Sequence, residues 1–551
     1  MRRLPLLLLA LLSGCGPLHT EIMLLRVPAF LLGSADTMEK VFRDEPWTRG
    51  PADKLTIEAA RNETEGIQLV VVTGGHDVRR VTVEASDLRC GRSIIPKARI
   101  TWNVVGYVRT EKPAYKVPRE GWWPDPLLPA ALFDVRAGEV QPVWLSVRVP
   151  DHAPPGLYRG KVTVRAEGQP RRSLPLEVRV WDFAIPRQQH LETCFLLRPD
   201  ELQRFYGLKD VPVEMYEAWM DFCLDRRICP ALYDWSHLDR DLERLVARQL
   251  DRGGACFGLA YAWPKKGTPE ERAKHNEPQI AAIRKLYDRV KARGWLPRAY
   301  VYCHDEIGKE HYDIAHELYA ALKKEMPGLR LMQTFYKDNP IPALDDVLDI
   351  WAPVTGRYRK EEMQAQQAKG DEVWWYVCCG PGKPYANLMI EWPGLDHRIL
   401  LWQTWKLGVT GFLYWSLNCW RDNYKADPRW PEGAWDPATF VNQQGGRHHG
   451  DGQLLYPGPG GQPLSSVRLE NFRDGIEDYE TLWLLRDAVA KLKKAGGHDV
   501  LVAEAEKALA LDDAVVKDLT HFTPDPQALR AARSALASLI ERATKAVAAA
   551  K

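Results

Sequence analysis

The chain has 551 residues, of which 45% are hydrophobic and 27% charged, with 75 Lys and Arg against 73 Asp and Glu. This composition excludes a collagen-like, low-complexity or mostly disordered protein. Because the charges nearly cancel and no long block of like charge stands out, we expect no nucleic-acid partner. The 21 Trp and 20 Tyr form an excess that could serve carbohydrate binding, because sugars dock on flat aromatic faces, although most aromatic side chains fill cores.

The first 14 residues have the features of a signal peptide. Arg2 and Arg3 precede an apolar run, residues 4–12, which is too short to span a bilayer. Residues 12–15 read Leu-Ser-Gly-Cys and resemble a bacterial lipobox, so we expect cleavage before Cys15 and lipidation of Cys15; an ordinary signal peptide cut nearby is the alternative. The sequence thus predicts a cell-envelope lipoprotein, periplasmic or surface-exposed, that contacts the membrane only through its lipid anchor.

The cysteines and histidines lack the spacing of a metal site. Cys223 and Cys229 do not form a C-x-x-C pair, and His304, His311 and His316 do not form an H-E-x-x-H motif. No glycine motif for cradling phosphate follows a predicted strand. We therefore expect no cofactor, no metal and no disulfide framework.

The residues before 187 have the pattern of a β domain. Short runs of alternating apolar and polar residues, separated by turn residues, occur without a convincing helix. This pattern predicts an antiparallel β-sandwich over residues 21–186. The clearest runs are 55–58, 66–72, 143–149 and 161–165.

After residue 186, eight apolar runs alternate with longer amphipathic stretches. This alternation predicts a (β/α)8 TIM barrel over residues 187–495, followed by a C-terminal helical extension over 496–551. A Gly-, Pro- and Trp-rich loop over 420–463 and a last barrel helix over 475–495 complete the prediction. The strands are expected at 191–197, 228–233, 255–261, 298–303, 329–335, 347–353, 372–378 and 409–415, and the helices between them at 213–226, 238–251, 269–292, 308–326, 360–368 and 396–407.

The fourth predicted barrel strand ends in the acidic pair Asp305-Glu306. Chemistry in such a barrel belongs at the carboxyl ends of the strands. Two neighbouring carboxyl groups can differ in protonation, so that one donates a proton to a glycosidic oxygen while the other stays ionised. Adjacent strand residues point to opposite faces, so both converge only if the backbone leaves strand geometry there. The alternative is that one of them caps the helix expected after Gly308.

Aromatic and polar residues near the ends of other strands are candidates for substrate binding, with core packing or loop capping as the alternative for each. His304 is expected to satisfy a backbone group, and a charged cluster over 468–478 is expected to form salt bridges. The candidates are Tyr336, Trp375, Tyr376, Tyr414, Trp415 and Asn418, and the charged cluster is Arg468, Glu470, Arg473, Asp474 and Asp478.

Several motifs together resemble glycoside hydrolase family 123, the β-N-acetylgalactosaminidases, and its relatives. They are the run 300–306, AARNETEGIQLVVV at 59–72, GWWPDPLLP at 121–129, GLYRGKVTV at 156–164, EVWWYVCCGP at 372–381, GFLYWSLNCW at 411–420 and VRLENFRDGIEDYETLWLL at 467–485. The motifs span nearly the whole mature chain.

The resemblance implies a substrate-assisted retaining mechanism on β-linked N-acetylhexosamine glycans, with N-acetylgalactosamine as the first candidate sugar. The acetamido oxygen of the sugar attacks its own anomeric carbon, Glu306 is the general acid/base and Asp305 stabilises the acetamido group. Two alternatives stay open: an inactive carbohydrate-binding lipoprotein on the same fold, and a retaining hydrolase whose protein nucleophile, Glu391 or Asp234, lies about 5 Å from Glu306. The linkage, exo or endo action and the oligomeric state stay open.

Overall fold

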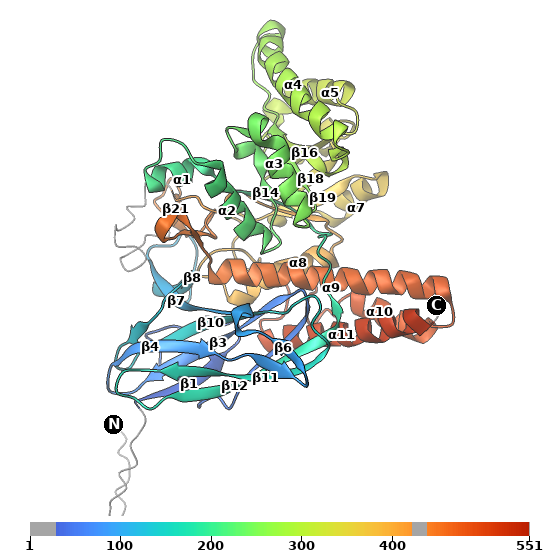
Figure 1. The fold of residues 1–551 in the computed structure, drawn as a ribbon. Helices are drawn as coiled ribbons and strands as arrows, with labels where there is room; N and C mark the ends of the chain where they lie inside the picture. The colour runs from blue at the N-terminus through green and yellow to red at the C-terminus, as the bar shows by residue number, and fades with distance from the viewer. Residues whose placement is uncertain (1–28, 421–437, 550–551) are drawn as a thin grey trace, which may run out of the picture.

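The computed structural model describes residues 29–420 and 438–549 (Figure 1). The expected signal segment and Cys15 lie outside these ranges, as does part of the loop expected at 420–463. Within the described ranges, every helix is too short or too polar to cross a bilayer.

Two facing sheets form the N-terminal domain, shown in blue to cyan in Figure 1, and apolar side chains from both fill the space between them. The strand pairs are antiparallel as expected, with one exception: β2 and β12 run parallel. Their ladder has an irregularity near Val180. The first sheet contains β1 (Phe30–Ala35), β3 (Thr64–Thr73), β10 (Val140–Arg148), β7 (Ile100–Thr110) and β8 (Gly121–Leu128), in spatial order. The second contains β2 (Leu55–Arg61), β12 (Arg172–Ala184), β11 (Gly156–Arg165), β4 (Val78–Ala85) and β9 (Phe133–Val135), with β5 (Leu88–Cys90) and β6 (Ser93–Ile95) beside β11.

Eight parallel strands then form a nearly closed barrel in which sequence neighbours are spatial neighbours and β13 pairs with β20. The ladder is interrupted between β14 and β15, where β14 has only two residues. The strands are β13 (Glu192–Leu196), β14 (Pro230–Ala231), β15 (Phe257–Tyr261), β16 (Ala299–Tyr302), β17 (Arg330–Phe335), β18 (Ile350–Pro353), β19 (Glu372–Tyr376) and β20 (Gly411–Tyr414). Each lies inside the run that the sequence predicts.

A helical segment follows every barrel strand, although α6 after β17 is a single turn. The helices are α1 (Pro199–Tyr206), α2 (Val213–Leu224), α3 (Leu238–Asp251), α4 (Pro269–Ala292), α5 (Tyr312–Glu325), α6 (Ile341–Leu344), α7 (Lys360–Lys369), α8 (Gly394–Lys406) and α9 (Val467–Ala495), with α10 (Asp499–Leu509) and α11 (Pro526–Ala549) at the C-terminus. Short strands β21 (Ala438–Val441), β22 (Arg447–His449), β23 (Tyr456–Pro457) and β24 (Pro463–Leu464) lie between β20 and α9.

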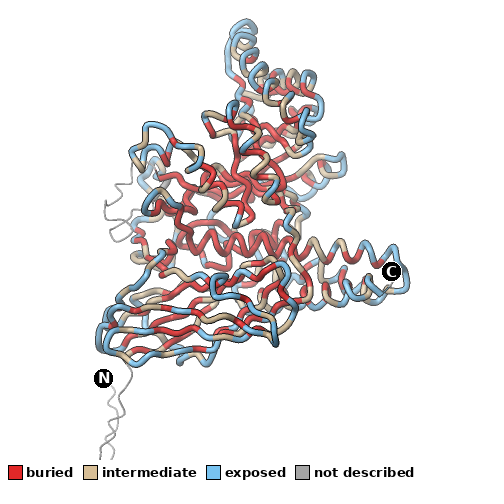
Figure 2. Tube along the Cα trace, in the orientation of Figure 1, coloured by how far each residue is buried: buried red, intermediate tan, exposed pale blue. Residues whose placement is uncertain are grey.

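Helix α9 begins earlier than the sequence predicts, at Val467 rather than 475, and Ser466 caps it by accepting a hydrogen bond from the Leu469 amide at 3.1 Å. Figure 1 shows α9 lying between the sandwich and the barrel, and Figure 2 shows that its N-terminal part is buried. Its first turns carry the charged cluster that the sequence predicts to form salt bridges, and these residues are buried and paired. Arg468, for example, donates to Asp125 of β8 at 2.8 Å.

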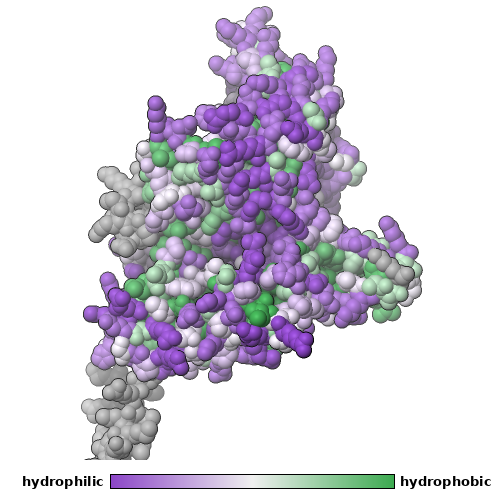
Figure 3. All heavy atoms as spheres, in the orientation of Figure 1, coloured by the Kyte–Doolittle hydropathy of each residue, from purple (hydrophilic) through white to green (hydrophobic). Residues whose placement is uncertain are grey.

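The surface seen in Figure 3 is largely hydrophilic, and its hydrophobic residues form small groups separated by polar ones. Such scattered groups are normal for a globular surface and mark no broad apolar interface on this face of the described residues. We therefore sought the functional site at the barrel mouth.

Candidate active site

The segment after β16 turns sharply where the acidic pair lies. Glu306 has a φ of 44°, a left-handed conformation that side-chain-bearing residues rarely adopt. Such a residue costs about 1–3 kcal/mol and persists only where its surroundings hold it. Here the Glu306 amide donates to the Thr334 hydroxyl at 3.0 Å, and the His304 ring contacts the Asp305 carbonyl at 2.9 Å. The backbone thus leaves strand geometry, as convergence of the two carboxyl groups requires.

The two carboxylates are held by phenol groups of barrel strands. The Tyr302 hydroxyl of β16 donates to Asp305 Oδ1 at 2.7 Å, and the Tyr376 hydroxyl of β19 donates to Glu306 Oε1 at 2.6 Å. Both tyrosine rings belong to the cluster that fills the barrel interior. Asp305 and Glu306 are accessible to solvent, although neighbouring groups partly desolvate the Glu306 carboxyl group. Both acids are therefore drawn to one barrel mouth and stay accessible there.

Helix capping does not explain the pair. Helix α5 begins at Tyr312, and its N-cap His311 makes no side-chain capping bond. A short 3-10 turn, Lys309–His311, precedes it and also lacks a side-chain cap at Gly308. The carboxylates instead accept the two tyrosine hydrogen bonds. The alternative that one of them caps the helix after Gly308 is therefore wrong.

The surroundings raise the pKa of Glu306 above its ordinary value. Partial burial is the main cause, and the nearby Asp305 charge adds to it; the hydrogen bond from Tyr376 and the charge of Lys337 act in the opposite direction. Burial and the Glu306 charge raise the pKa of Tyr376 far above its usual range, so this phenol stays a neutral donor. A carboxyl group with a raised pKa is suited to donating a proton near neutral pH.

Three of the predicted substrate-binding residues lie around this mouth. Tyr376 holds Glu306, while Tyr336 and Trp415 are half-buried at the edge of the interior cluster. Burial is the main cause of a raised pKa of Tyr336, and the nearby thiols and the charge of Glu306 add to it. The Trp415 ring donates from Nε1 to Asp451 Oδ1 at 2.8 Å, which fixes its orientation.

The other three predicted residues are placed elsewhere. Trp375 points outward into the helix layer, where its Nε1 donates to the Thr404 hydroxyl of α8 at 3.1 Å. Tyr414 is also outward, and its hydroxyl accepts from the Gly452 amide at 2.9 Å. Asn418 is buried, and its side-chain amide bonds the backbone of Arg198. Its Oδ1 accepts from the Arg198 amide at 2.9 Å, and its Nδ2 donates to the Arg198 carbonyl at 3.0 Å. These side chains support the walls and loops of the mouth rather than line it.

Comparisons with known proteins agree with this geometry. The model of the glycoside hydrolase 123 catalytic domain matches residues 233–485, and the model of the glycoside hydrolase 123 N-terminal domain matches residues 34–166. The chain belongs to glycoside hydrolase family 123. It is a glycosidase.

Solved structures show the same fold. A family 123 glycoside hydrolase from Clostridium perfringens, analysed for glycolipid glycan hydrolysis, superposes with a TM-score of 0.68 at 14% identity, covering 94% of this chain and 98% of that one. A family 5 xyloglucanase from Bacteroides ovatus gives a TM-score of only 0.30 at 10% identity, over 81% of this chain and 99% of that one. No curated protein sequence matches the chain significantly.

Sequence reasoning missed several residues of this family 123 site. Tyr302 and Thr334 orient the acidic pair, with the Thr334 hydroxyl 3.1 Å from that of Tyr302. At the rim, the Trp263 ring stacks on His304 with 4.3 Å between ring centroids, and Trp263 remains 43% exposed. A polar residue next to the end of a predicted strand was the available signal for Thr334.

A cavity of about 360 Å³ lies at the carboxyl ends of β13, β14 and β15. Its lining includes Arg198, Asp234 and Tyr261, and the Tyr261 hydroxyl donates to Asp234 Oδ1 at 2.9 Å. Burial raises the pKa of Asp234 to about 6, while that hydrogen bond opposes the shift. The volume falls in the range of small-ligand pockets. The cavity lies at the same end of the barrel as the acidic pair, and Tyr261 in its wall contacts the Tyr302 ring with 5.6 Å between centroids.

Of the two alternative nucleophiles, Glu391 is enclosed. Its carboxylate is buried, accepts from the Tyr115 hydroxyl at 2.9 Å and contacts the ring of His449. His449, which lies within the loop expected over 420–463, is itself buried. Asp234, at the mouth, remains the alternative nucleophile that an experiment must test.

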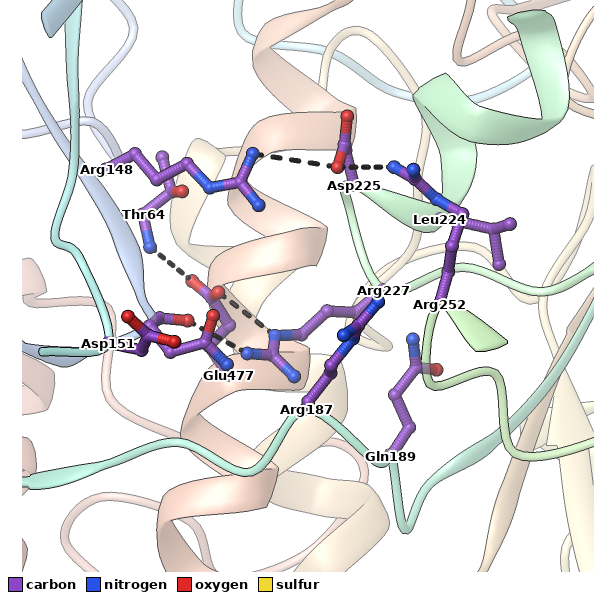
Figure 4. A pocket seen from close by; sticks show the side chains of 11 residues that line it. Thr64, Arg148, Asp151, Arg187, Gln189, Leu224, Asp225, Arg227, Arg252 and Glu477 are labelled. Carbon is purple, nitrogen blue, oxygen red and sulfur yellow. Dashed lines mark hydrogen bonds and ion pairs between the residues drawn. The ribbon is translucent and has the colours of Figure 1, made fainter. Parts of the chain in front are cut away.

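Another cavity, of about 460 Å³, lies at the junction of the sandwich, α2 and α9 (Figure 4). Its polar residues pair across the junction: Arg148 of the sandwich contacts Asp225 at 3.7 Å, and the Thr64 amide of the sandwich donates to Glu477 of α9 at 3.4 Å. This cavity therefore belongs to the contact between domains.

Proposed function

We propose that this glycosidase hydrolyses β-linked N-acetylhexosamine glycans by a substrate-assisted retaining mechanism, with N-acetylgalactosamine as the preferred sugar. The observation that carries the proposal is the placement of Asp305 and Glu306 at one barrel mouth by two different tyrosines. Adjacent carboxylates suit this mechanism, because neither has to attack the anomeric carbon from the opposite side of the sugar.

In the first step, the acetamido oxygen of the sugar bonds to the anomeric carbon as the bond to the departing oxygen breaks. Glu306, whose raised pKa favours the protonated form, gives its proton to that oxygen. Asp305 accepts a hydrogen bond from the acetamido N–H and stabilises the positive charge that develops there. In the second step, the Glu306 carboxylate takes a proton from water, and the water oxygen attacks the anomeric carbon and opens the oxazoline-type ring.

The substrate class of the proposal is a glycan presented at a surface. The Clostridium perfringens relative was analysed for glycolipid glycan hydrolysis. A lipid anchor at Cys15 would hold the catalytic domains close to a membrane, so that the enzyme meets glycans in the cell envelope or at the cell surface.

The proposal is tested with three aryl β-glycosides that differ only in the sugar: N-acetylgalactosaminide, N-acetylglucosaminide and galactoside. Substrate assistance predicts hydrolysis of the first, slower hydrolysis of the second and none of the galactoside, because only the acetamido sugars carry the nucleophile. A thiazoline analogue of the acetamido sugar should inhibit competitively.

Hydrolysis of the galactoside at a similar rate, or a glycosyl-enzyme trapped on Asp234, would contradict substrate assistance. The variant Trp375→Phe is a matched control, since this ring packs against α8 outside the mouth and its loss should leave the order of the three substrates unchanged.

A further inference from the structure

Two adjacent thiols lie directly above the barrel interior. Cys378 and Cys379 follow β19, and their sulfur atoms are 3.9 Å apart. Both side chains pack with the interior cluster that also contains Tyr376 and Tyr336. Cys378 is buried and Cys379 is half-buried. Neither thiol has a part in the proposed hydrolysis.

We propose that Cys378 and Cys379 are a reversible redox site that closes to a disulfide between neighbouring residues, and that closure disturbs the tyrosines at the barrel mouth. The bond itself is independent of the proposed function, whereas its effect on turnover rests on that function.

The oxidant is a second disulfide, carried by a small molecule or by a protein. The Cys379 thiolate attacks one of its sulfur atoms, so that a mixed disulfide forms and one thiolate leaves. Cys378 then loses its proton and attacks Cys379 Sγ, which expels the second thiolate. Two protein thiols are oxidised, the external disulfide is reduced to two thiols, and the two protons pass to solvent or to the released thiolates.

Accessibility decides the order of these steps. Cys379 is the more exposed thiol, while its hydrogen bond with Cys378 and burial raise the pKa of the Cys378 thiol. Because the thiolate is the nucleophile, Cys379 attacks the external disulfide first, and Cys378 then attacks the mixed disulfide that results. Adjacent Cα atoms are about 3.8 Å apart, which is shorter than the usual disulfide span of about 4.4–6.8 Å. The resulting strain makes the bond easy to reduce, as in labile regulatory disulfides.

Ring closure must bring the two sulfur atoms from 3.9 Å to a bonded distance of about 2.05 Å. The Cys378 backbone is held, because its carbonyl accepts from Asn387 Nδ2 at 3.0 Å and its amide donates to the Gly380 carbonyl at 2.9 Å. The movement therefore falls on Cys379 and Gly380. Gly380 packs so closely on Tyr336 that a Cβ there would lie 2.9 Å from the Tyr336 hydroxyl.

The residues that precede Cys378 connect the thiol pair to Glu306. Tyr376 lies two residues before Cys378 and donates to Glu306 at 2.6 Å. The structure has both thiols free and this hydrogen bond formed. We therefore expect the dithiol form to be the more active one, since a small displacement of a positioning group can cost a large factor in rate.

The test treats the full chain with oxidised glutathione or with dithiothreitol, blocks free thiols with iodoacetamide and identifies peptides by mass spectrometry. The expected oxidised peptide carries no label on Cys378 or Cys379 and is lighter than the dithiol peptide by two hydrogens. In Cys379→Ser this product cannot form. Cys90→Ser, which removes a half-buried thiol of the sandwich, is the matched control and should behave like the wild type.

Activity gives the second measurement. Oxidation should lower kcat/KM about tenfold in the wild type and in Cys90→Ser, dithiothreitol should restore it, and Cys379→Ser should not respond. If no N-acetylhexosaminide is hydrolysed in any state, the proposed function fails, and hydrogen exchange of the 372–388 peptide then reports the movement instead. Full labelling of both thiols after oxidation would overturn the proposal, as would a closed ring that leaves both kcat/KM and hydrogen exchange unchanged.

Discussion

The surroundings of Glu306 contain groups that raise its pKa and groups that lower it. Burial and the Asp305 charge favour its protonated form, whereas the hydrogen bond from Tyr376 favours the carboxylate. A general acid must be protonated when it acts, so the basic limb of the pH–rate profile follows the pKa of Glu306. Variants that remove one influence at a time can therefore separate them.

Tyr376→Phe removes a donor to the carboxylate and should raise the pKa of Glu306, which shifts the basic limb of kcat/KM to higher pH. Asp305→Asn removes a neighbouring negative charge and should shift it to lower pH, together with a large loss of rate. The pH dependence of kcat/KM on an activated aryl glycoside measures both shifts.

Tyr358→Phe is the control for this pair, because the Tyr358 hydroxyl donates to the Leu407 carbonyl at 3.2 Å on the outer side of the barrel and its loss should leave the limb in place. Shifts of the same sign in Tyr376→Phe and Asp305→Asn would show that the assigned causes are incorrect.

At the scale of the strand, β19 and β20 explain which aromatic residues reach the mouth. Trp375 and Tyr376 are neighbours, and so are Tyr414 and Trp415, so only one of each pair can face the interior. The sequence predicts where the strands lie, but it does not predict which alternate residues of a strand face the barrel interior. A shift of one residue in the predicted strand position exchanges the inward and outward faces. The acidic pair could be predicted from its place at a strand end, and Tyr302 belongs to the same strand. Thr334 of β17 and Tyr376 of β19 come from other strands, so their contacts with the pair depend on the assembled barrel.

The first turns of α9 show another limit of the pattern. Their charged residues form the salt bridges that the sequence predicts, but the bridges are buried and join α9 to the sandwich and to α8. Hydrophobic periodicity cannot reveal a helix whose buried face is charged, because the pairing partners are distant in sequence. The start of α9 was therefore placed too late.

At the scale of the whole molecule, the sandwich and barrel are joined through a buried charge network. Arg398 of α8 contacts Asp478 of α9 at 2.6 Å and Glu65 of the sandwich at 3.1 Å. Arg533 of α11 contacts the same Asp478 at 2.7 Å. The sequence predicts each layer separately, but this docking depends on pairs that only the folded chain brings together.

Arg398→Met should therefore be strongly destabilising, since it leaves buried carboxylates short of a partner. We expect a loss of about 3 kcal/mol in the free energy of unfolding, measured by denaturant titration. Arg542→Met is the control, because the Arg542–Glu504 pair at 2.7 Å lies at the surface, where solvent screens it, so its loss should change the free energy of unfolding far less. Equal losses in the two variants would contradict a structural role for the network.

The most direct measurement compares Glu306→Gln with the wild type on an unactivated β-N-acetylhexosaminyl oligosaccharide, while binding of the thiazoline analogue is followed in parallel. The account predicts that kcat/KM falls by about 10²–10⁴ and that the variant still binds the analogue, because the amide keeps the shape of the site but cannot deliver the proton. A variant that cleaves the oligosaccharide within tenfold of the wild-type rate would show that Glu306 is not the acid.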